Sequence, residues 1–163
     1  MKTGAEIIAH HLHDAGCRTA FGIPGGEVLA LVDALTQSGI QFVLTKHENS
    51  AGFMAEGAWH ATGAPGILVA TLGPGVANAV NVVANAHQDK VPLIFLTGRV
   101  DAAESETYTH QVFDHQALLR PIVKASFCAA PSAVGAMIEK ALLIATEGQP
   151  GPVHIDVPIG VAE

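Results

Sequence analysis

Two stretches of this sequence, residues 66–72 and 92–97, are apolar at almost every position. A strand with one face in water alternates apolar and polar side chains. A strand of a parallel sheet is covered on both faces, and it is therefore a continuous apolar run. The two stretches predict a parallel sheet with helices packed on both of its sides.

Segments typical of helices and of strands alternate along the 163 residues. The alternation predicts a single domain over residues 1–163, with a three-layer α/β/α fold around a central, mainly parallel six-stranded sheet. A loop is expected where charged and hydroxyl residues gather, at 98–111. The strands are expected at residues 19–23, 40–45, 66–72, 92–97, 122–127 and 153–157. The helices are expected at residues 3–16, 28–39, 48–62, 76–87, 115–119 and 131–147.

Composition and charge exclude several classes of protein. Hydrophobic residues make up 49% of the chain and charged residues only 14%, which excludes a disordered protein. The net charge of −7, without a basic stretch rich in aromatics, argues against nucleic acid as a partner. No segment has the length and apolarity of a membrane span or the pattern of a signal peptide. Cys17 and Cys128 form no metal or redox motif, so we expect reduced thiols in a cytoplasmic protein.

Glu48 is the ionisable residue in the most informative position. It follows an expected strand and lies in the first turn of an expected helix, near the sheet edge where α/β proteins bind ligands. Its neighbours at 51–55 are small or apolar. The carboxyl group should therefore face little water, and it can hold or donate a proton near neutral pH. Alternatively, Glu48 only complements the positive end of its helix.

Three glycine-bearing turns also follow strands. The turn at Gly25 allows a ligand to approach the backbone closely, or it is merely tight. The turn at 73–78 nearly fits the dinucleotide-binding fingerprint, with Asn78 in place of the third glycine. That fingerprint belongs to the first strand–helix turn of a fold, whereas this turn is the third. Arg99 follows the fourth strand and either meets an anion or is a surface charge.

The nine histidines raise the question of a metal site. His10 and His13 share one face of the first expected helix, and His110, Asp114 and His115 cluster in or near the expected loop. Neither group has a third or fourth ligand at the fixed spacing that a structural metal site requires. We therefore predict no metal site within this chain.

Eight short motifs follow one another in the order found in one enzyme family. They are Phe21-Gly22-Ile23-Pro24-Gly25-Gly26, Lys46-His47-Glu48, Ala55-Glu56-Gly57-Ala58, Ala70-Thr71-Leu72-Gly73-Pro74-Gly75-Val76-Ala77-Asn78, Asp89-Lys90-Val91-Pro92-Leu93-Ile94, Leu96-Thr97-Gly98, Arg120-Pro121-Ile122-Val123-Lys124 and Gly151-Pro152-Val153-His154-Ile155-Asp156. The series runs from about Thr3 to Val161. It resembles the pyrimidine-binding domain of thiamine-diphosphate-dependent enzymes, closest to the acetolactate synthase and benzaldehyde lyase branch.

The resemblance implies a role for several residues. The family's glutamate at the position of Glu48 hydrogen-bonds N1′ of the aminopyrimidine ring and activates the cofactor for attack on a 2-keto acid. Gln111 matches a glutamine on the substrate side, although Val112 beside it departs from the synthase pattern. His47, next to Glu48, is expected to tune the carboxyl group or to meet substrate. The residues expected to line the pyrimidine pocket are Pro24, Gly25, Thr71, Pro74 and Asn78.

The resemblance also implies that this chain holds half of an active site. The family binds the cofactor's diphosphate through Mg²⁺ on a Gly-Asp-Gly motif, and this sequence has none. A diphosphate-binding domain from a missing segment or another chain must supply that half, in a homodimer or tetramer. The isolated domain should be inactive. The small residues Ala51, Gly52, Ala55 and Ala58 share a helix face, which would pack against such a partner or against the chain's own sheet.

The expected function is therefore a lyase or transferase that cleaves or forms carbon–carbon bonds of 2-keto acids or 2-hydroxy ketones. One alternative is a dinucleotide-binding α/β module that uses Gly73-x-Gly75 with Arg99 near a phosphate. Another is the small subunit of a split 2-keto acid decarboxylase. The sequence finishes after Gly160 as at a domain boundary, which favours a truncated domain over a split enzyme. The small-molecule substrate and its acceptor stay open.

Overall fold

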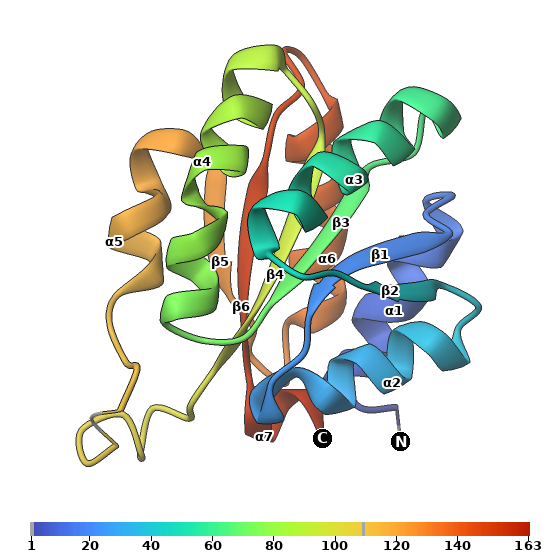
Figure 1. Cartoon of the computed structure of the whole chain (residues 1–163). Coiled ribbons are helices and arrows are strands. Elements are labelled where there is room, and N and C mark those ends of the chain that lie inside the picture. Colours follow the sequence, from blue (N-terminus) through green and yellow to red (C-terminus); the bar gives the residue numbers. More distant parts are fainter. Residues whose placement is uncertain (1, 109) are drawn as a thin grey trace.

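The fold is a six-stranded sheet between two layers of helices (Figure 1). The structure is a computed structural model, and it describes residues 2–108 and 110–163. All neighbouring strands pair in parallel, in the order β2-β1-β3-β4-β6-β5. The predicted three-layer α/β/α fold is confirmed. The strands are β1 (Thr19–Ile23), β2 (Gln41–Leu44), β3 (Gly66–Ala70), β4 (Leu93–Arg99), β5 (Ala125–Cys128) and β6 (Val153–Pro158).

The helices divide into two layers that bury different faces of the sheet. Ile67 and Val69 of β3 point into a core shared with α1, α2, α6 and α7, whereas Leu68 and Ala70 point into a core shared with α3, α4 and α5. Both faces are thus apolar, which explains the continuous apolar runs. The helices are α1 (Gly4–Asp14), α2 (Leu29–Gln37), α3 (Glu48–Thr62), α4 (Pro74–Asp89), α5 (His115–Leu119), α6 (Val134–Thr146) and α7 (Ile159–Ala162), with 3-10 turns η1 (Gly26–Val28) and η2 (Arg120–Ile122).

Helix ends follow the local chemistry of the sequence. Thr3 and Glu6 form the expected capping box of α1. The Thr3 hydroxyl accepts a hydrogen bond from the Glu6 N–H at 3.2 Å, and the Glu6 carboxylate accepts one from the Thr3 N–H at 2.8 Å. Helix α3 is capped at its start by His47, whose Nδ1 accepts from the Asn49 N–H, and at its end by Gly63 in the left-handed region. The expected bounds of α3 are confirmed.

Most expected elements differ from the observed ones by one to three residues at an end; the helix expected at 131–147, for example, is Val134–Thr146. In two cases a proline explains the difference. The expected strand at 122–127 begins later, at Ala125, because Pro121 lacks an N–H and occupies the 3-10 turn η2. Helix α4 begins at Pro74 and not at Val76. Proline is well suited to the first helical position, where its fixed φ fits and its missing N–H would have had no helical partner.

Strand order creates a topological switch point at the carboxyl edge of the sheet. After β1 the chain crosses to β2 on one side, and after β3 it continues to β4 on the other. Such a topological switch point, here between β1 and β3, is where open α/β sheets bind ligands. The loops that follow β1, β2 and β3 all meet at this edge, which is the lower one in Figure 1.

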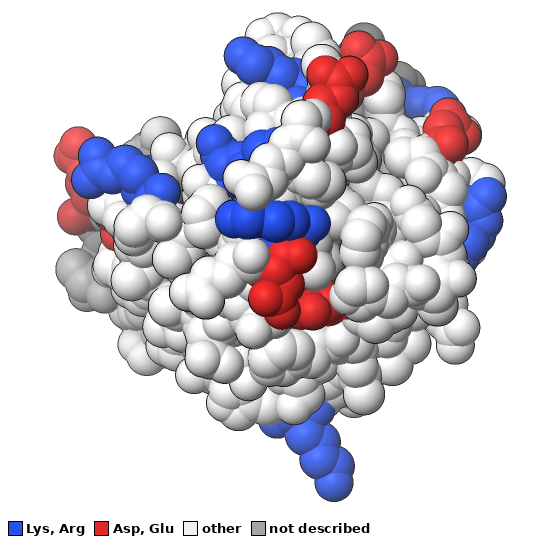
Figure 2. All heavy atoms as spheres, turned by 90° about the horizontal axis from the view of Figure 1, so that it is seen from above, with Lys and Arg blue, Asp and Glu red and all other residues white. Residues whose placement is uncertain are grey.

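The opposite edge of the sheet carries few charged side chains. Seen from that side, basic and acidic residues are interspersed among uncharged ones (Figure 2).

Across residues 2–108 and 110–163, no helix combines the length and the apolarity that crossing a lipid bilayer requires.

Candidate functional site

Glu48 lies in the first turn of α3 with only 5% of its surface exposed, as the sequence predicted. Its Oε2 accepts a hydrogen bond at 3.0 Å from Nδ2 of Asn78, on the neighbouring helix α4. Its Oε1 has no hydrogen-bond partner among the described residues. This oxygen lies 3.4 Å from the position that a Cβ on Gly75 would occupy. One carboxylate oxygen is therefore held in place while the other faces the glycine turn.

A close contact between α3 and α4 brings Glu48 and Asn78 together. A Cβ on Gly52 would lie 2.7 Å from Cγ2 and 3.0 Å from Cβ of Val82, so no side chain fits there. Hydrogen bonds flank this contact at both ends, from Asn78 to Glu48 and from Asn85 to Glu56. The small residues Ala51, Gly52 and Ala55 thus pack within the chain itself.

Thr71 connects the switch point to the position between Oε1 of Glu48 and Gly75, which we call the recess. Its hydroxyl donates to Oε2 of Glu27 at 2.5 Å. A Cβ on Gly25 would overlap the Thr71 side chain, and one on Gly75 would lie 3.1 Å from the Thr71 methyl carbon. Gly25, Thr71 and Gly75 therefore form a wall of backbone and small atoms beside Glu48. Sequence reasoning missed Glu27, because its partner Thr71 is 44 residues away in the chain.

The remaining predicted site residues have different positions. Pro24 precedes Gly25 in the loop between β1 and η1, and Pro74 begins α4. His47 is exposed, and its Nδ1 is used in capping α3. Gln111 is also exposed, and it is one of two described non-glycine residues with positive φ, at 62°. Its carbonyl oxygen packs so closely on Gly73 that a Cβ there would overlap it.

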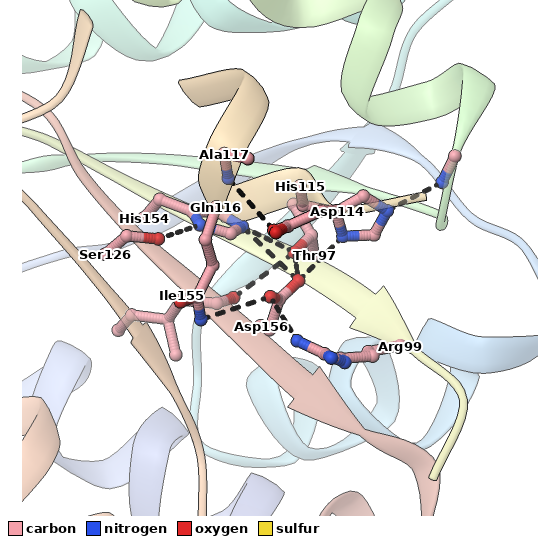
Figure 3. A network of polar contacts seen from close by, with 11 residues as sticks. Thr97, Arg99, Asp114, His115, Gln116, Ala117, Ser126, His154, Ile155 and Asp156 are labelled. Atoms are coloured by element: carbon pink, nitrogen blue, oxygen red, sulfur yellow. Dashed lines mark hydrogen bonds and ion pairs between the residues drawn. The ribbon is translucent and has the colours of Figure 1, made fainter. Parts of the chain in front are cut away.

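A buried polar network lies just behind this wall, centred on the fully buried Asp156 of β6 (Figure 3). Oδ1 of Asp156 accepts from His115 Nδ1 at 2.7 Å and from the Thr97 hydroxyl at 2.9 Å. Oδ2 accepts from Arg99 at 3.2 Å and from Gln116 at 3.4 Å. The anion that Arg99 meets is thus the carboxylate of its own chain.

The network continues from Asp156 in two directions. Nε2 of His115 accepts the backbone N–H of Gly73 at 3.0 Å. On the other side, His154 Nε2 lies 2.8 Å from the Thr97 hydroxyl, and His154 Nδ1 lies 2.6 Å from the hydroxyl of Ser126. The network therefore joins three neighbouring strands, β4, β6 and β5, to the turn that begins α4.

Asp156 is held as a carboxylate by these neighbours. Burial by itself would raise its pKa, because a buried charge loses hydration. The hydrogen bonds from His115 and His154 to the carboxylate outweigh burial and hold the pKa of Asp156 well below its usual range. Burial is the largest influence on the two cysteines: it raises the pKa of Cys17 to about 11 against the lowering effect of Arg18, and it raises the pKa of Cys128 against the lowering effect of Arg99.

His115, His154 and Asp156 have the residue types of a metal site. Their ligand atoms lie within 4.8 Å of one another. Each of these atoms is, however, already engaged by a hydrogen-bond partner within the chain. Of the residues that the sequence suggested as possible metal ligands, only His115 belongs to this cluster. Asp114 instead accepts from the Ala117 N–H and caps α5.

Two of the grooves away from Glu48 adjoin residues singled out in the sequence. One, of about 360 Å³, runs between α1 and α2 on the other face of the sheet and is lined in part by Glu6, His10 and His13. A small one, of about 30 Å³, lies between the buried network and the loop before α5, beside Arg99 and Phe113. Glu48 lines neither of them.

The buried network left one signal in the sequence that was not used. β6 contains His154 and Asp156, two polar residues spaced by two in an otherwise apolar strand. Residues spaced by two point to the same face of a strand. A pair of buried polar groups on one face requires partners, and those partners come from β4, β5 and α5.

Comparisons with known proteins agree with this geometry. Residues 2–118 match the family model described as thiamine pyrophosphate enzyme, N-terminal TPP binding domain. The chain is 40% identical over 160 residues to the acetolactate synthase isozyme 3 large subunit of Escherichia coli, which covers 97% of this chain and 28% of that protein. It is also 40% identical over 161 residues to a probable acetolactate synthase large subunit of Methanocaldococcus jannaschii, covering 98% of this chain and 27% of that protein. The chain thus spans little more than a quarter of these relatives. It belongs to the N-terminal TPP-binding domains of thiamine pyrophosphate enzymes of the acetolactate synthase type.

Proposed function

We propose that this chain is the pyrimidine-binding half of an enzyme that uses thiamine diphosphate to cleave or form carbon–carbon bonds of 2-keto acids or 2-hydroxy ketones. The observation that carries the proposal is the state of Glu48. It is buried, one of its oxygens is fixed by Asn78, and the other faces a glycine-walled recess at the switch point.

The recess fits a flat heteroaromatic ring. A side chain at Gly25 would collide with Thr71, and one at Gly75 would crowd Thr71 and Oε1 of Glu48, so glycine keeps the backbone open to close approach. Thr71 adds a methyl group and a hydroxyl, and Pro24 and Pro74 stiffen the two turns. Oε1 of Glu48 supplies the polar group that a ring nitrogen such as N1′ would pair with.

Glu48 is proposed to move a proton. When bound, thiamine diphosphate supplies a nucleophilic thiazolium carbon that attacks the carbonyl of the substrate. Glu48 would share a proton between Oε1 and the ring nitrogen, and Asn78 would keep the carboxyl group from rotating by holding Oε2. Burial among Ala51, Gly52 and the sheet excludes water, so the proton stays between the two partners.

The substrate is proposed to meet the other side of the site. Gln111 has a backbone conformation that costs a non-glycine residue about 1–3 kcal/mol, and such conformations cluster at functional sites. Its carbonyl contacts Gly73, so the loop is fixed to the wall of the recess. His47 is exposed beside Glu48 and is proposed to face the small-molecule substrate as well.

The second half of the site is proposed to come from a diphosphate-binding domain that carries Mg²⁺. The relatives are more than three times longer than this chain. Large apolar side chains are exposed next to Glu48, namely Leu44, Phe53 and Met54, and a partner domain would cover them. We expect a homodimer or tetramer, and no catalysis by the isolated domain. A cytoplasmic location remains a prediction from the sequence.

The dinucleotide-binding alternative is not favoured. The N–H of Gly73, which such a fingerprint would offer to a phosphate, already donates to His115. Arg99 is paired with Asp156. Titration of the intact protein with NADP, beside thiamine diphosphate with Mg²⁺, separates the two functions. A split decarboxylase is distinguished from a longer enzyme by the length of the open reading frame.

Replacing Glu48 with glutamine in the intact enzyme tests the proposal. We expect Glu48→Gln to abolish exchange of the C2 proton of bound thiamine diphosphate, followed by NMR, while cofactor binding largely survives. The matched control is Glu56→Gln, because Glu56 also lies on α3 and also accepts from an asparagine of α4, Asn85. The control should exchange like the wild type. Unchanged exchange in Glu48→Gln would remove this residue from the mechanism.

A further inference from the structure

We propose that Asp156 and His115 are positioning residues, which hold the turn Gly73-Pro74-Gly75 in the geometry that forms the wall of the recess. The proposal rests on the function proposed above for that recess. The relay runs from the Asp156 carboxylate through the His115 ring to the backbone N–H of Gly73, over distances of 2.7 and 3.0 Å (Figure 3). None of the three residues touches Glu48.

Gly73 is the residue on which the turn depends. Its φ of 63° and ψ of −111° belong to a region that only glycine adopts without strain. The next residue, Pro74, begins α4, which carries both Gly75 and Asn78. A change at Gly73 would therefore move the atoms that face Oε1 of Glu48 and the donor that holds Oε2.

The hydrogen bonds fix the protonation of His115. A backbone N–H can only donate, so Nε2 of His115 must be the unprotonated acceptor for Gly73. Its single proton is then on Nδ1, which donates to Asp156. The partner of one ring nitrogen sets the state of the other, and Asp156 thus selects the tautomer that can hold Gly73.

The same bookkeeping assigns the other branch. The single hydroxyl proton of Thr97 goes to Asp156, so Thr97 accepts from His154 Nε2. His154 Nδ1 lies 2.6 Å from the Ser126 hydroxyl, which can donate to it or accept from it. The His115 ring is neutral in this arrangement, because its Nε2 accepts from the Gly73 N–H. The charges of Asp156 and Arg99 offset each other.

A change of Asp156 to asparagine would disrupt this arrangement. The carboxylate accepts on both oxygens, from His115 and Thr97 on one and from Arg99 and Gln116 on the other. An amide has one oxygen and one NH₂ group, so either orientation sets an N–H against donors. If the proton of His115 moves from Nδ1 to Nε2, the Nε2–H faces the N–H of Gly73, and the hydrogen bond between them is lost.

Two aromatic rings flank the His115 side chain. Besides Asp156 and the Gly73 N–H, the ring faces Phe113 at 5.2 Å and His154 at 6.3 Å between ring centres. Gln111, four residues earlier in the same segment, packs its carbonyl on Gly73. Loss of the His115–Gly73 bond should therefore loosen the cofactor wall and the substrate-side loop together.

The test compares three variants of the intact protein. Asp156→Asn breaks the relay at its origin, and His115→Phe removes both ring nitrogens. Ser126→Ala is the matched control, because it removes a hydrogen bond of the same network at the end away from Gly73. Hydrogen exchange at the Gly73 amide, followed by mass spectrometry without cofactor, reports the turn directly. Titration with thiamine diphosphate and Mg²⁺ gives the dissociation constant of the cofactor, and C2 proton exchange at saturation shows whether the recess still activates it.

We expect Gly73 to exchange ~10-fold faster or more in Asp156→Asn and in His115→Phe, because a lost hydrogen bond in a charged network is worth at least that factor. The dissociation constant for thiamine diphosphate should rise by about the same factor, whereas Ser126→Ala should stay within about twofold of the wild type. His115→Gln, which retains an acceptor on its side chain, should recover part of the protection.

Two results would overturn the proposal. One is wild-type exchange at Gly73 in Asp156→Asn and His115→Phe. The other is an equal acceleration in Ser126→Ala, which would mean general loosening. The exchange measurement needs no cofactor, so it is independent of Glu48. If the relay variants accelerate Gly73 exchange but no variant or wild type binds thiamine diphosphate, the relay stands and the proposed function fails.

Discussion

Gly52→Ala is the substitution that most directly tests how Glu48 is positioned. Gly52 lies one turn after Glu48 on α3, and Val82 lies one turn after Asn78 on α4, so the two helices touch between their hydrogen-bonded pairs. An added methyl group would lie 2.7 Å from Cγ2 and 3.0 Å from Cβ of Val82. Rotating the Val82 side chain does not move its Cβ, so the helices themselves must separate.

The size of the effect follows from these distances. Carbon atoms in contact are about 3.5–4.0 Å apart, so the helices must move by roughly 1 Å. The bond from Asn78 to Glu48, 3.0 Å in the structure, would then exceed hydrogen-bond range. Overpacking costs about 1–3 kcal/mol and the lost bond to a carboxylate about 1.5–3 kcal/mol. Because alanine favours the helix more than glycine does, about 1 kcal/mol of this loss is offset. We expect a net loss of about 1.5–5 kcal/mol in the free energy of unfolding.

Urea denaturation followed by circular dichroism measures this loss, with Gly57→Ala as control. Gly57 is on the same helix and has no atom within 4 Å of its virtual Cβ, so alanine there should stabilise the protein by about 0.5–1 kcal/mol. Adding Val82→Ala to Gly52→Ala should recover at least ~1 kcal/mol relative to additivity. The reasoning is refuted if Gly52→Ala behaves like Gly57→Ala, or if the double variant is additive.

Three further predictions concern stability. The pKa of Cys17 is raised from 9.0 to about 11 by burial, so the unfolded chain loses this proton first and stability falls between those values as pH rises, by at most ~3 kcal/mol. Urea denaturation at about pH 8 and about pH 10.5 should show the fall in the wild type and less of it in Cys17→Ala. The pKa of Asp156 is lowered, so its contribution is present above the unfolded value near 3.8 and is lost below it. The free energy of unfolding, measured as the pH is lowered through this range, should fall less steeply in Asp156→Asn than in the wild type. Thr3→Ala removes the capping box and should lower the thermal midpoint, at a cost of about 1 kcal/mol.

Most of the fold could be predicted because its determinants are local. The apolar run at 66–72 reports burial on both faces, and capping chemistry at Thr3 and glycines such as Gly63 mark helix ends. Glu48 was located by the same local logic, since a strand followed by a small-residue helix identifies a position at the carboxyl edge. The start of β5 was misjudged because apolar residues after Pro121 pack in a 3-10 turn and not in a strand.

The polar contacts could not be predicted because their partners are distant in the sequence. Asp156 and His115 are separated by 41 residues, and Thr71 and Glu27 by 44. No periodicity links such residues; only the strand order brings them together. The close approach of α3 to α4 could not be predicted either, because the need for glycine at position 52 follows from its contact with Val82 on the other helix.

The recess beside Glu48 is shaped by what its residues lack. Gly25 and Gly75 have no side chain to remove, so substitution at either position can only crowd the wall further. Single mutations at these glycines can thus exclude an enlarged cofactor analogue, but they cannot admit one. Among the three wall residues, only Thr71 has a side chain that a mutation could shorten. Engineering the site for a bulkier ring should therefore begin at Thr71.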